Sequence, residues 1–165
     1  MTARSGRLVI GLGNPDCGDD AVGRLVARWL RGKVPADVAI KEQNGDAAEL
    51  VGMLRGADCV FLVDAAVSGA PVGTIRVLDC TAGEVPPPRP GASSHGLGLA
   101  EAIALASRLD GLPRVCRVYT VEGVAFAPGA AISPEVAAAA EALAARLMGE
   151  LRHAICKSLA PRNSA

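Results

Sequence analysis

The sequence predicts a single α/β domain, with a twisted, mostly parallel five-stranded sheet, one antiparallel edge strand and helices on both faces. Three observations lead to this fold class. Short, continuously apolar runs alternate with segments of helical periodicity, as in a parallel sheet whose strands are buried on both sides. Half of the 165 residues are hydrophobic, which is enough for one sizeable core. No repeat or linker divides the chain, so one domain spans 1–165, with its core at about 7–156 and frayed ends.

The first half of the chain predicts three strands and two helices. In chain order these are strand 8–12, a helix from about 19 to 32, strand 37–42, a helix from 46 to about 56 and strand 59–63. The runs LVIGL and CVFLV are buried strands, and the strand between them is weaker. The second helix begins with a capping-box pattern, in which Asp46 is the N-cap and Glu49 the third helical residue.

The second half predicts a hairpin strand, two helices and one more buried strand. In chain order these are a turn at 68–73, strand 74–79 returning antiparallel at an edge, a long loop at 81–94, helix 96–109, strand 115–123 and a last helix opened by Ser133–Pro134. The loop is rich in Pro, Gly and Ser, and loops of this length in compact domains are often functional. Proline is favoured at the first position of a helix.

Composition narrows the classes of function. Acidic and basic residues balance at 17 each and aromatic residues are rare, so we expect no nucleic-acid binding. No apolar run is long enough to span a bilayer and no leading segment resembles a signal peptide, so we expect no membrane insertion. The five cysteines form no CxxC motif, and Cys59 and Cys116 lie in apolar runs, where a free thiol behaves as a small hydrophobe. We therefore expect a cytoplasmic protein.

In a mostly parallel sheet, ligands bind beyond the carboxyl ends of the strands, and this rule selects three segments. The first is GLGNPDCGDDAVG at 11–23, where glycines permit a tight turn before the first helix. We expect Asp19 to cap that helix; two adjacent carboxylates cannot both do so, which leaves Asp20 for another role. A dinucleotide-binding GxGxxG loop is disfavoured, because Asp16 replaces the third glycine and the acidic pair would repel a pyrophosphate.

The second and third segments each contribute one candidate side chain. Asp64 directly follows the buried strand 59–63 and should face the ligand crevice; the alternative is a turn or capping aspartate in DAAVSG. His95 lies in SSHGLGLAEA at 93–102, just before a helix and among glycines that keep its approach open. A lone histidine is more often structural, but the chain has only two, and His153 lies on the last helix.

Asp20, Asp64 and His95 thus converge from three segments at one end of the predicted sheet. Two carboxylates and an imidazole suit a borderline divalent metal such as nickel or zinc, with coordination positions left open. Alternatively, the two carboxylates share a proton, as in an aspartic-protease pair. A Ser-His-Asp triad is not expected, because the chain has no GxSxG elbow.

Four ordered segments resemble the signature of the hydrogenase maturation endopeptidases over roughly residues 7–150. They are GLGNPDCGDDAVG at 11–23, VDAAVSGAPVGTI at 63–75, SSHGLGLAEAIAL at 93–105 and VEGVAFAPGAAISPEV at 121–136. By motif position, the resemblance assigns nickel contact to Asp20, often Glu in relatives, and to Asp64 and His95; the two carboxylates are the expected catalytic residues. The loop QNGDAAEL at 43–50 departs from the Gly-Gly/Cys-Thr pattern of many relatives, which bears on which large subunit is processed.

The resemblance implies an endopeptidase that removes the C-terminal extension of a nickel–iron hydrogenase large-subunit precursor after nickel insertion, with the bound nickel as the recognition feature. It implies an aspartic-type, nickel-dependent protease without a permanently bound cofactor, since nickel comes with the substrate; zinc or cadmium can substitute in crystals. The expected partner is the precursor, and we expect a monomer. The alternative from a different class is a non-catalytic, nickel-sensing, chaperone-like binder of the large subunit.

Overall fold

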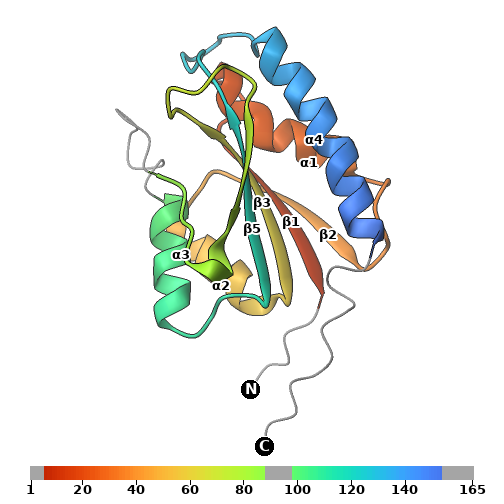
Figure 1. Cartoon of the computed structure of the whole chain (residues 1–165), viewed down its shortest axis with the longest axis vertical. Helices are drawn as coiled ribbons and strands as arrows, with labels where there is room; N and C mark the ends of the chain where they lie inside the picture. Colours follow the sequence, from red (N-terminus) through yellow and green to blue (C-terminus); the bar gives the residue numbers. More distant parts are fainter. Residues whose placement is uncertain (1–5, 88–97, 154–165) are drawn as a thin grey trace, which may run out of the picture.

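The computed structural model describes residues 6–87 and 98–153, which form a sheet between two pairs of helices (Figure 1). The strands are β1 (Arg7–Leu12), β2 (Val38–Gln43), β3 (Cys59–Ala66), β4 (Ile75–Asp79) and β5 (Val115–Glu122). They lie in the order β2-β1-β3-β5-β4, and every neighbouring pair is parallel except β4 with β5. The predicted fold class, a mostly parallel five-stranded sheet with one antiparallel edge strand, is confirmed.

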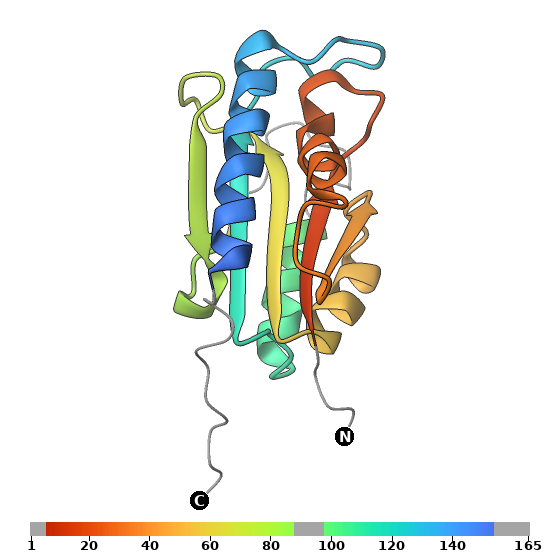
Figure 2. The ribbon, with the colours of Figure 1, turned by 90° about the vertical axis from the view of Figure 1, so that its right-hand side faces the viewer.

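Each face of the sheet is covered by two helices (Figure 2). On one face lie α1 (Val22–Leu30) and α4 (Pro134–Arg152), and on the other lie α2 (Ala47–Gly56) and α3 (Gly98–Arg108). Two short 3-10 helices, η1 (Gly18–Ala21) and η2 (Cys80–Ala82), follow β1 and β4. Side chains alternate across the strands, so that Val9 packs with α1 and α4 whereas Ile10 packs with α2 and α3. This two-sided burial explains the continuously apolar strand sequences.

Local sequence signals set the helix ends. Asp46 caps α2, because its Oδ1 accepts a hydrogen bond of 2.9 Å from the backbone N–H of Glu49. Pro134 takes the first position of α4, where its missing N–H removes no intrahelical bond. The first helix is shorter than predicted: α1 ends at Leu30, and the turn beyond it uses Gly32 at a φ of +73°.

Two expectations about strands are wrong. Residues 74–79 do return antiparallel at an edge, but β4 is no hairpin partner of β3, because β5 lies between them and pairs with both. The strand predicted at 59–63 continues to Ala66, because Asp64 to Ala66 pair with Thr120 to Glu122 of β5. Both differences come from β5, which enters the sheet much later in the chain.

The thiols follow the expectation in part. Cys116 is a buried free thiol, whereas Cys59, expected to be free, is disulfide-bonded.

Within 6–87 and 98–153, no helix combines the length and the apolar character that spanning a membrane requires.

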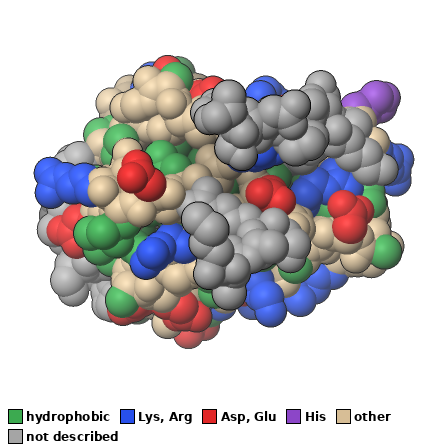
Figure 3. All heavy atoms as spheres, turned by 90° about the horizontal axis from the view of Figure 1, so that it is seen from below, with side chains coloured by type: hydrophobic (Ala, Val, Ile, Leu, Met, Phe, Trp, Pro, Cys, Tyr) green, Lys and Arg blue, Asp and Glu red, His purple; other side chains and the backbone are tan. Residues whose placement is uncertain are grey.

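Acidic and basic side chains are interspersed on the end of the molecule where the parallel strands begin (Figure 3). Arg7, the first residue of β1, pairs with Asp37 through Nε and Nη2 at 2.8 and 2.9 Å. Its Nη1 donates to the carbonyl of Leu151 at 2.5 Å, so that one buried arginine ties the start of β1 to the end of α4. Arg7 thus stabilises the fold at the end of the sheet where the parallel strands begin.

Candidate active site

The glycine loop after β1 packs directly against the start of the first helix. At Gly13 the φ is +123°, and a Cβ there would lie 1.8 Å from the backbone oxygen of Asp20. At Gly11 a Cβ would lie 2.3 Å from the backbone oxygen of Gly23. A side chain at either position would displace the segment that carries Asp20. The loop therefore needs glycine for close backbone contact.

Asp20 is partly exposed and lies in η1, just beyond the carboxyl end of β1. Its Oδ2 accepts a hydrogen bond of 2.9 Å from the backbone N–H of Asn14, which fixes the side chain to the glycine loop. Three residues later, a Cβ at Gly23 would lie 2.2 Å from the backbone oxygen of Val63. The start of α1, which directly follows the segment that carries Asp20, therefore packs on β3 at Val63, the residue before Asp64.

Asp19 does not cap its own helix, so that expectation is wrong. Cys17 is the N-cap of η1, and the Asp19 carboxylate turns to another loop. Fully buried, it accepts four hydrogen bonds of 2.7–2.9 Å, from the N–H groups of Val124, Ala125 and Ser133 and from the Ser133 hydroxyl. Burial raises the pKa of Asp19, but these hydrogen bonds lower it by more, and the pKa lies below its ordinary value. Asp19 therefore fastens the loop between β5 and α4 to the segment after β1.

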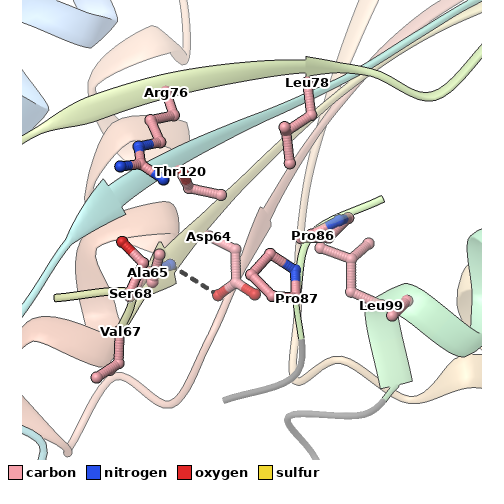
Figure 4. A pocket seen from close by; sticks show the side chains of 12 residues that line it. Asp64, Ala65, Val67, Ser68, Arg76, Leu78, Pro86, Pro87, Leu99 and Thr120 are labelled. Atoms are coloured by element: carbon pink, nitrogen blue, oxygen red, sulfur yellow. Dashed lines mark hydrogen bonds between the residues drawn. The ribbon is translucent and has the colours of Figure 1, made fainter. Parts of the chain in front are cut away.

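Asp64 lies inside β3, not directly after a strand as predicted, because the pairing with β5 continues past it. Its Oδ1 accepts a hydrogen bond of 2.8 Å from the N–H of Ala65. The side chain is partly exposed and lines a pocket near the carboxyl end of the strand (Figure 4). A carboxylate in this place can meet a ligand that enters the pocket.

The pocket is open to solvent on one side, and its empty space, open solvent included, is about 600 Å³. Three neighbouring strands form one wall, and the chain after η2 and the first turn of α3 form the other. Its lining residues are Asp64, Ala65, Ala66, Val67, Ser68, Arg76, Leu78, Pro86, Pro87, Leu99, Ala100 and Thr120. Mostly apolar walls with a few polar groups are typical of a ligand site.

Three polar lining residues were not predicted from the sequence: Ser68, Arg76 and Thr120. Alternation in β4 was a usable signal, because Ile75 and Val77 pack on the α1 and α4 side whereas Arg76 and Leu78 face the pocket. No local sequence pattern indicates that Arg76 and Thr120 lie level with Asp64, because this alignment depends on β5 lying between β3 and β4.

His95 lies outside the described residues. The description resumes at Gly98, where α3 begins; a Cβ there would lie 1.9 Å from the backbone oxygen of Gly45, so the helix start packs against the loop after β2. The next residue, Leu99, lines the same pocket as Asp64. In the described part of the chain no three His, Cys, Asp or Glu side chains are grouped to hold a metal, and the predicted set includes a residue beyond that part.

A family model described as hydrogenase maturation protease matches residues 31–150. The chain belongs to the hydrogenase maturation protease family. It is therefore an endopeptidase, a hydrolase of peptide bonds. Of the predicted site residues, Asp64 and His95 lie inside the matched range, whereas Asp20 precedes it. No curated protein matches the chain.

Solved structures with related descriptions share the fold of this maturation protease. The hydrogenase maturating endopeptidase HybD from E. coli is 24% identical, with 89% of this chain and 92% of that chain covered and a TM-score of 0.72. The [NiFe] hydrogenase maturation protease HycI from Thermococcus kodakarensis KOD1 is also 24% identical, with 92% and 95% covered and a TM-score of 0.69. The hydrogenase 2 maturation peptidase from Thaumarchaeota archaeon SCGC_AB-539-E09 is 21% identical, with 90% and 99% covered and a TM-score of 0.61. At these identities the likeness shows the fold.

Proposed function

We propose that this protease removes the C-terminal extension of a nickel–iron hydrogenase large-subunit precursor after nickel insertion, and that it recognises the bound nickel. The observation that carries the proposal is the place of Asp64, a partly exposed carboxylate in the pocket of a family member. Asp20 lies in η1, beyond the carboxyl end of β1, which is the neighbour of the strand that carries Asp64. His95 precedes α3, whose first turn lines this pocket. We assign nickel contact to Asp20, Asp64 and His95, and catalysis to the two carboxylates.

In this proposal nickel is part of the substrate, and the enzyme holds no cofactor of its own. Two carboxylates and an imidazole can complete the coordination of a nickel ion that the precursor exposes. Binding energy then arises only when the ion is present, which makes cleavage depend on prior nickel insertion. The same contact holds the scissile peptide bond beside the carboxylates and so turns recognition into positioning.

Peptide hydrolysis needs a group that accepts a proton and returns it. As the oxygen of a water molecule bonds to the scissile carbonyl carbon, one carboxylate of the pair accepts a proton from that water. As the carbon–nitrogen bond breaks, the proton passes to the departing nitrogen, and the new carboxyl and amino ends are released. Asp64 is the better placed of the two to do this, because it lines the pocket that would hold the extension.

The loop after β2 supports a role in the choice of large subunit. Gln43 shapes it, because its Oε1 accepts a hydrogen bond of 2.6 Å from the N–H of Gly45. The backbone carbonyl of Gln43 accepts a hydrogen bond of 3.2 Å from the N–H of Gly13. Gly98, the first residue of α3, packs against the backbone of Gly45. The loop thus lies between the glycine loop and the start of α3. Since it carries Asn44 in a pattern that departs from many relatives, we propose that it contacts the precursor and selects it.

The test mixes purified protein with nickel-loaded and nickel-free precursor and follows the size of the large subunit on a gel. We expect trimming of the nickel-loaded form alone. Asp64→Asn should trim at least about 100-fold more slowly, since proton transfer by a positioned side chain contributes that much. Glu141→Gln, an exposed carboxylate on α4, should trim at the wild-type rate. Equal trimming of both forms would contradict nickel recognition, and binding without trimming would favour the chaperone-like binder.

A further inference from the structure

Three polar residues form a row across neighbouring strands inside the pocket. Asp64 of β3 is opposite Thr120 of β5, and Thr120 is opposite Arg76 of β4. Residues directly opposite each other in a sheet point to the same face, and Figure 4 shows Asp64 and Arg76 on the two sides of Thr120. Strands lie about 4.8 Å apart, so the backbones at the two ends of the row are separated by about 10 Å. An extended peptide spans that distance in about three residues.

The Arg76 side chain is exposed and has no hydrogen-bond or ion-pair partner within 6–87 and 98–153. Several other arginines of the fold are paired, for example Arg28 with Glu42 at 3.0 Å. The nearby carboxylate on the same face of β5, Glu122, is engaged elsewhere: it accepts hydrogen bonds of 2.6–3.0 Å from the N–H and hydroxyl of Ser68 and from the N–H of Gly69. The guanidinium therefore faces the pocket, and no carboxylate of the described part of the chain pairs with it.

We infer that Arg76 is a specificity residue that binds a carboxylate of the precursor's extension, about three residues from the bond that is cleaved. The inference rests on the proposed function, which places the extension in this pocket. A guanidinium binds carboxylates through two parallel hydrogen bonds, and a peptide offers such groups as acidic side chains or as its own C-terminus. When a cation of the substrate balances the charge of Asp64, the positive charge of Arg76 remains among the described lining residues, and this charge favours an acidic group of the substrate beside it.

The experiment measures kcat/KM for trimming of nickel-loaded precursor by the wild type and by Arg76→Gln, Arg76→Lys and Arg108→Gln. Arg108 is a matched control, an exposed arginine at the far end of α3. We expect Arg76→Gln to lower kcat/KM about tenfold, mainly through KM, because a contact made equally in the ground and transition states affects binding. Arg76→Lys should lose less, and Arg108→Gln should equal the wild type.

Two altered precursors identify the carboxylate. In one, every Asp and Glu of the extension becomes Asn or Gln; in the other, a Gly-Ser segment moves the C-terminus away. If the penalty of Arg76→Gln disappears with the first, the partner is an acidic side chain, and if it disappears with the second, the partner is the C-terminus. Wild-type kinetics of Arg76→Gln, or a penalty that persists with both precursors, would overturn the inference while leaving the protease intact. Failure of the wild type to trim any nickel-loaded precursor would instead overturn the proposed function and the inference with it.

Discussion

Asp19 and Asp20 are neighbours in sequence and differ in almost every physical respect. The Asp19 carboxylate is fully buried and accepts four hydrogen bonds from residues more than 100 positions away. The Asp20 carboxylate is partly exposed and is held by the N–H of Asn14 in its own loop. One carboxylate holds two distant segments together, and the other is presented at the end of the sheet.

The difference shows what an acidic pair at a strand end can provide. A buried carboxylate is stable only when donors satisfy it, and those donors fix its position and that of its neighbour. Anchoring Asp19 therefore holds the backbone from which Asp20 projects. The comparison predicts that changes at Asp19 affect the free energy of unfolding, whereas changes at Asp20 affect cleavage.

The largest effect is expected from Asp20→Asn. If Asp20 contacts the substrate's nickel and takes part in hydrolysis, removal of its charge should slow trimming by about 10²–10⁴-fold. The free energy of unfolding should change by less than about 1 kcal/mol, as is usual for a partly exposed site. Rates of trimming and urea unfolding of the same preparation check both parts. Normal cleavage by this variant would remove Asp20 from the site.

The next effect in size is expected from Asp19→Asn, which keeps the shape of the side chain. One Asp19 oxygen accepts from Val124, Ala125 and the Ser133 hydroxyl, and the other accepts from the Ser133 N–H. In either orientation the new NH₂ group faces an N–H donor, so at least one buried bond is lost. We expect the free energy of unfolding to fall by about 3 kcal/mol, as for a broken buried charge network. Urea unfolding against Asp20→Asn, the matched control, measures it, and equal stability of the two variants would contradict the comparison.

The sequence could predict what is encoded locally. The run LVIGL, the cap pair Asp46 and Glu49 and the proline after Ser133 each act within a few residues, and each is where the structure has it. The role of Asp19 could not be predicted, because its partners are 105 or more positions away and are brought close only by the fold. Arg76 was missed for the same reason, since only β5 aligns it with Asp64. The predicted contribution of His95 stays a prediction.

A smaller effect is expected where the glycine loop touches the acidic pair. Gly13→Ala places a Cβ against the backbone oxygen of Asp20 and strains a φ of +123°, so we expect a loss of about 2 kcal/mol in stability and a marked loss of cleavage. Gly52→Ala is the control, because a Cβ there meets nothing within 4 Å on α2. It should be neutral or stabilising by up to about 1 kcal/mol. Equal behaviour of the two variants would show that the loop is not shaped for Asp20.

Acid should reduce the contribution of the Asp19 carboxylate to the free energy of unfolding. The pKa of Asp19 is lower in the folded protein than its ordinary value, so its charge stabilises the fold above the unfolded pKa, near 4. That stabilisation is lost as the pH falls through the folded pKa. The stability difference between wild type and Asp19→Asn should be constant above about pH 5 and should shrink below pH 4. Urea unfolding at several pH values measures it, and a difference that grows on acidification would contradict the assigned shift.

The smallest effect is expected when Asp20 becomes Glu, and the same change at Asp19 sharpens the contrast. Glu is one methylene longer than Asp but ligates a metal in the same way. Because Asp20 is partly exposed, the longer side chain has room to move, and we expect trimming within about tenfold of the wild type, a change of about 1.4 kcal/mol. Asp19→Glu has no such room, because the buried carboxylate would be pushed into the N–H groups that now bind it, and overpacking of this kind costs about 1–3 kcal/mol before any hydrogen bond is lost. The trimming rate tests the prediction for Asp20→Glu, and urea unfolding tests the predicted loss of stability in Asp19→Glu. If Asp20→Glu is as inactive as Asp20→Asn while it remains folded, the position of this carboxylate matters to within one methylene, and metal contact by a movable side chain would no longer explain its role.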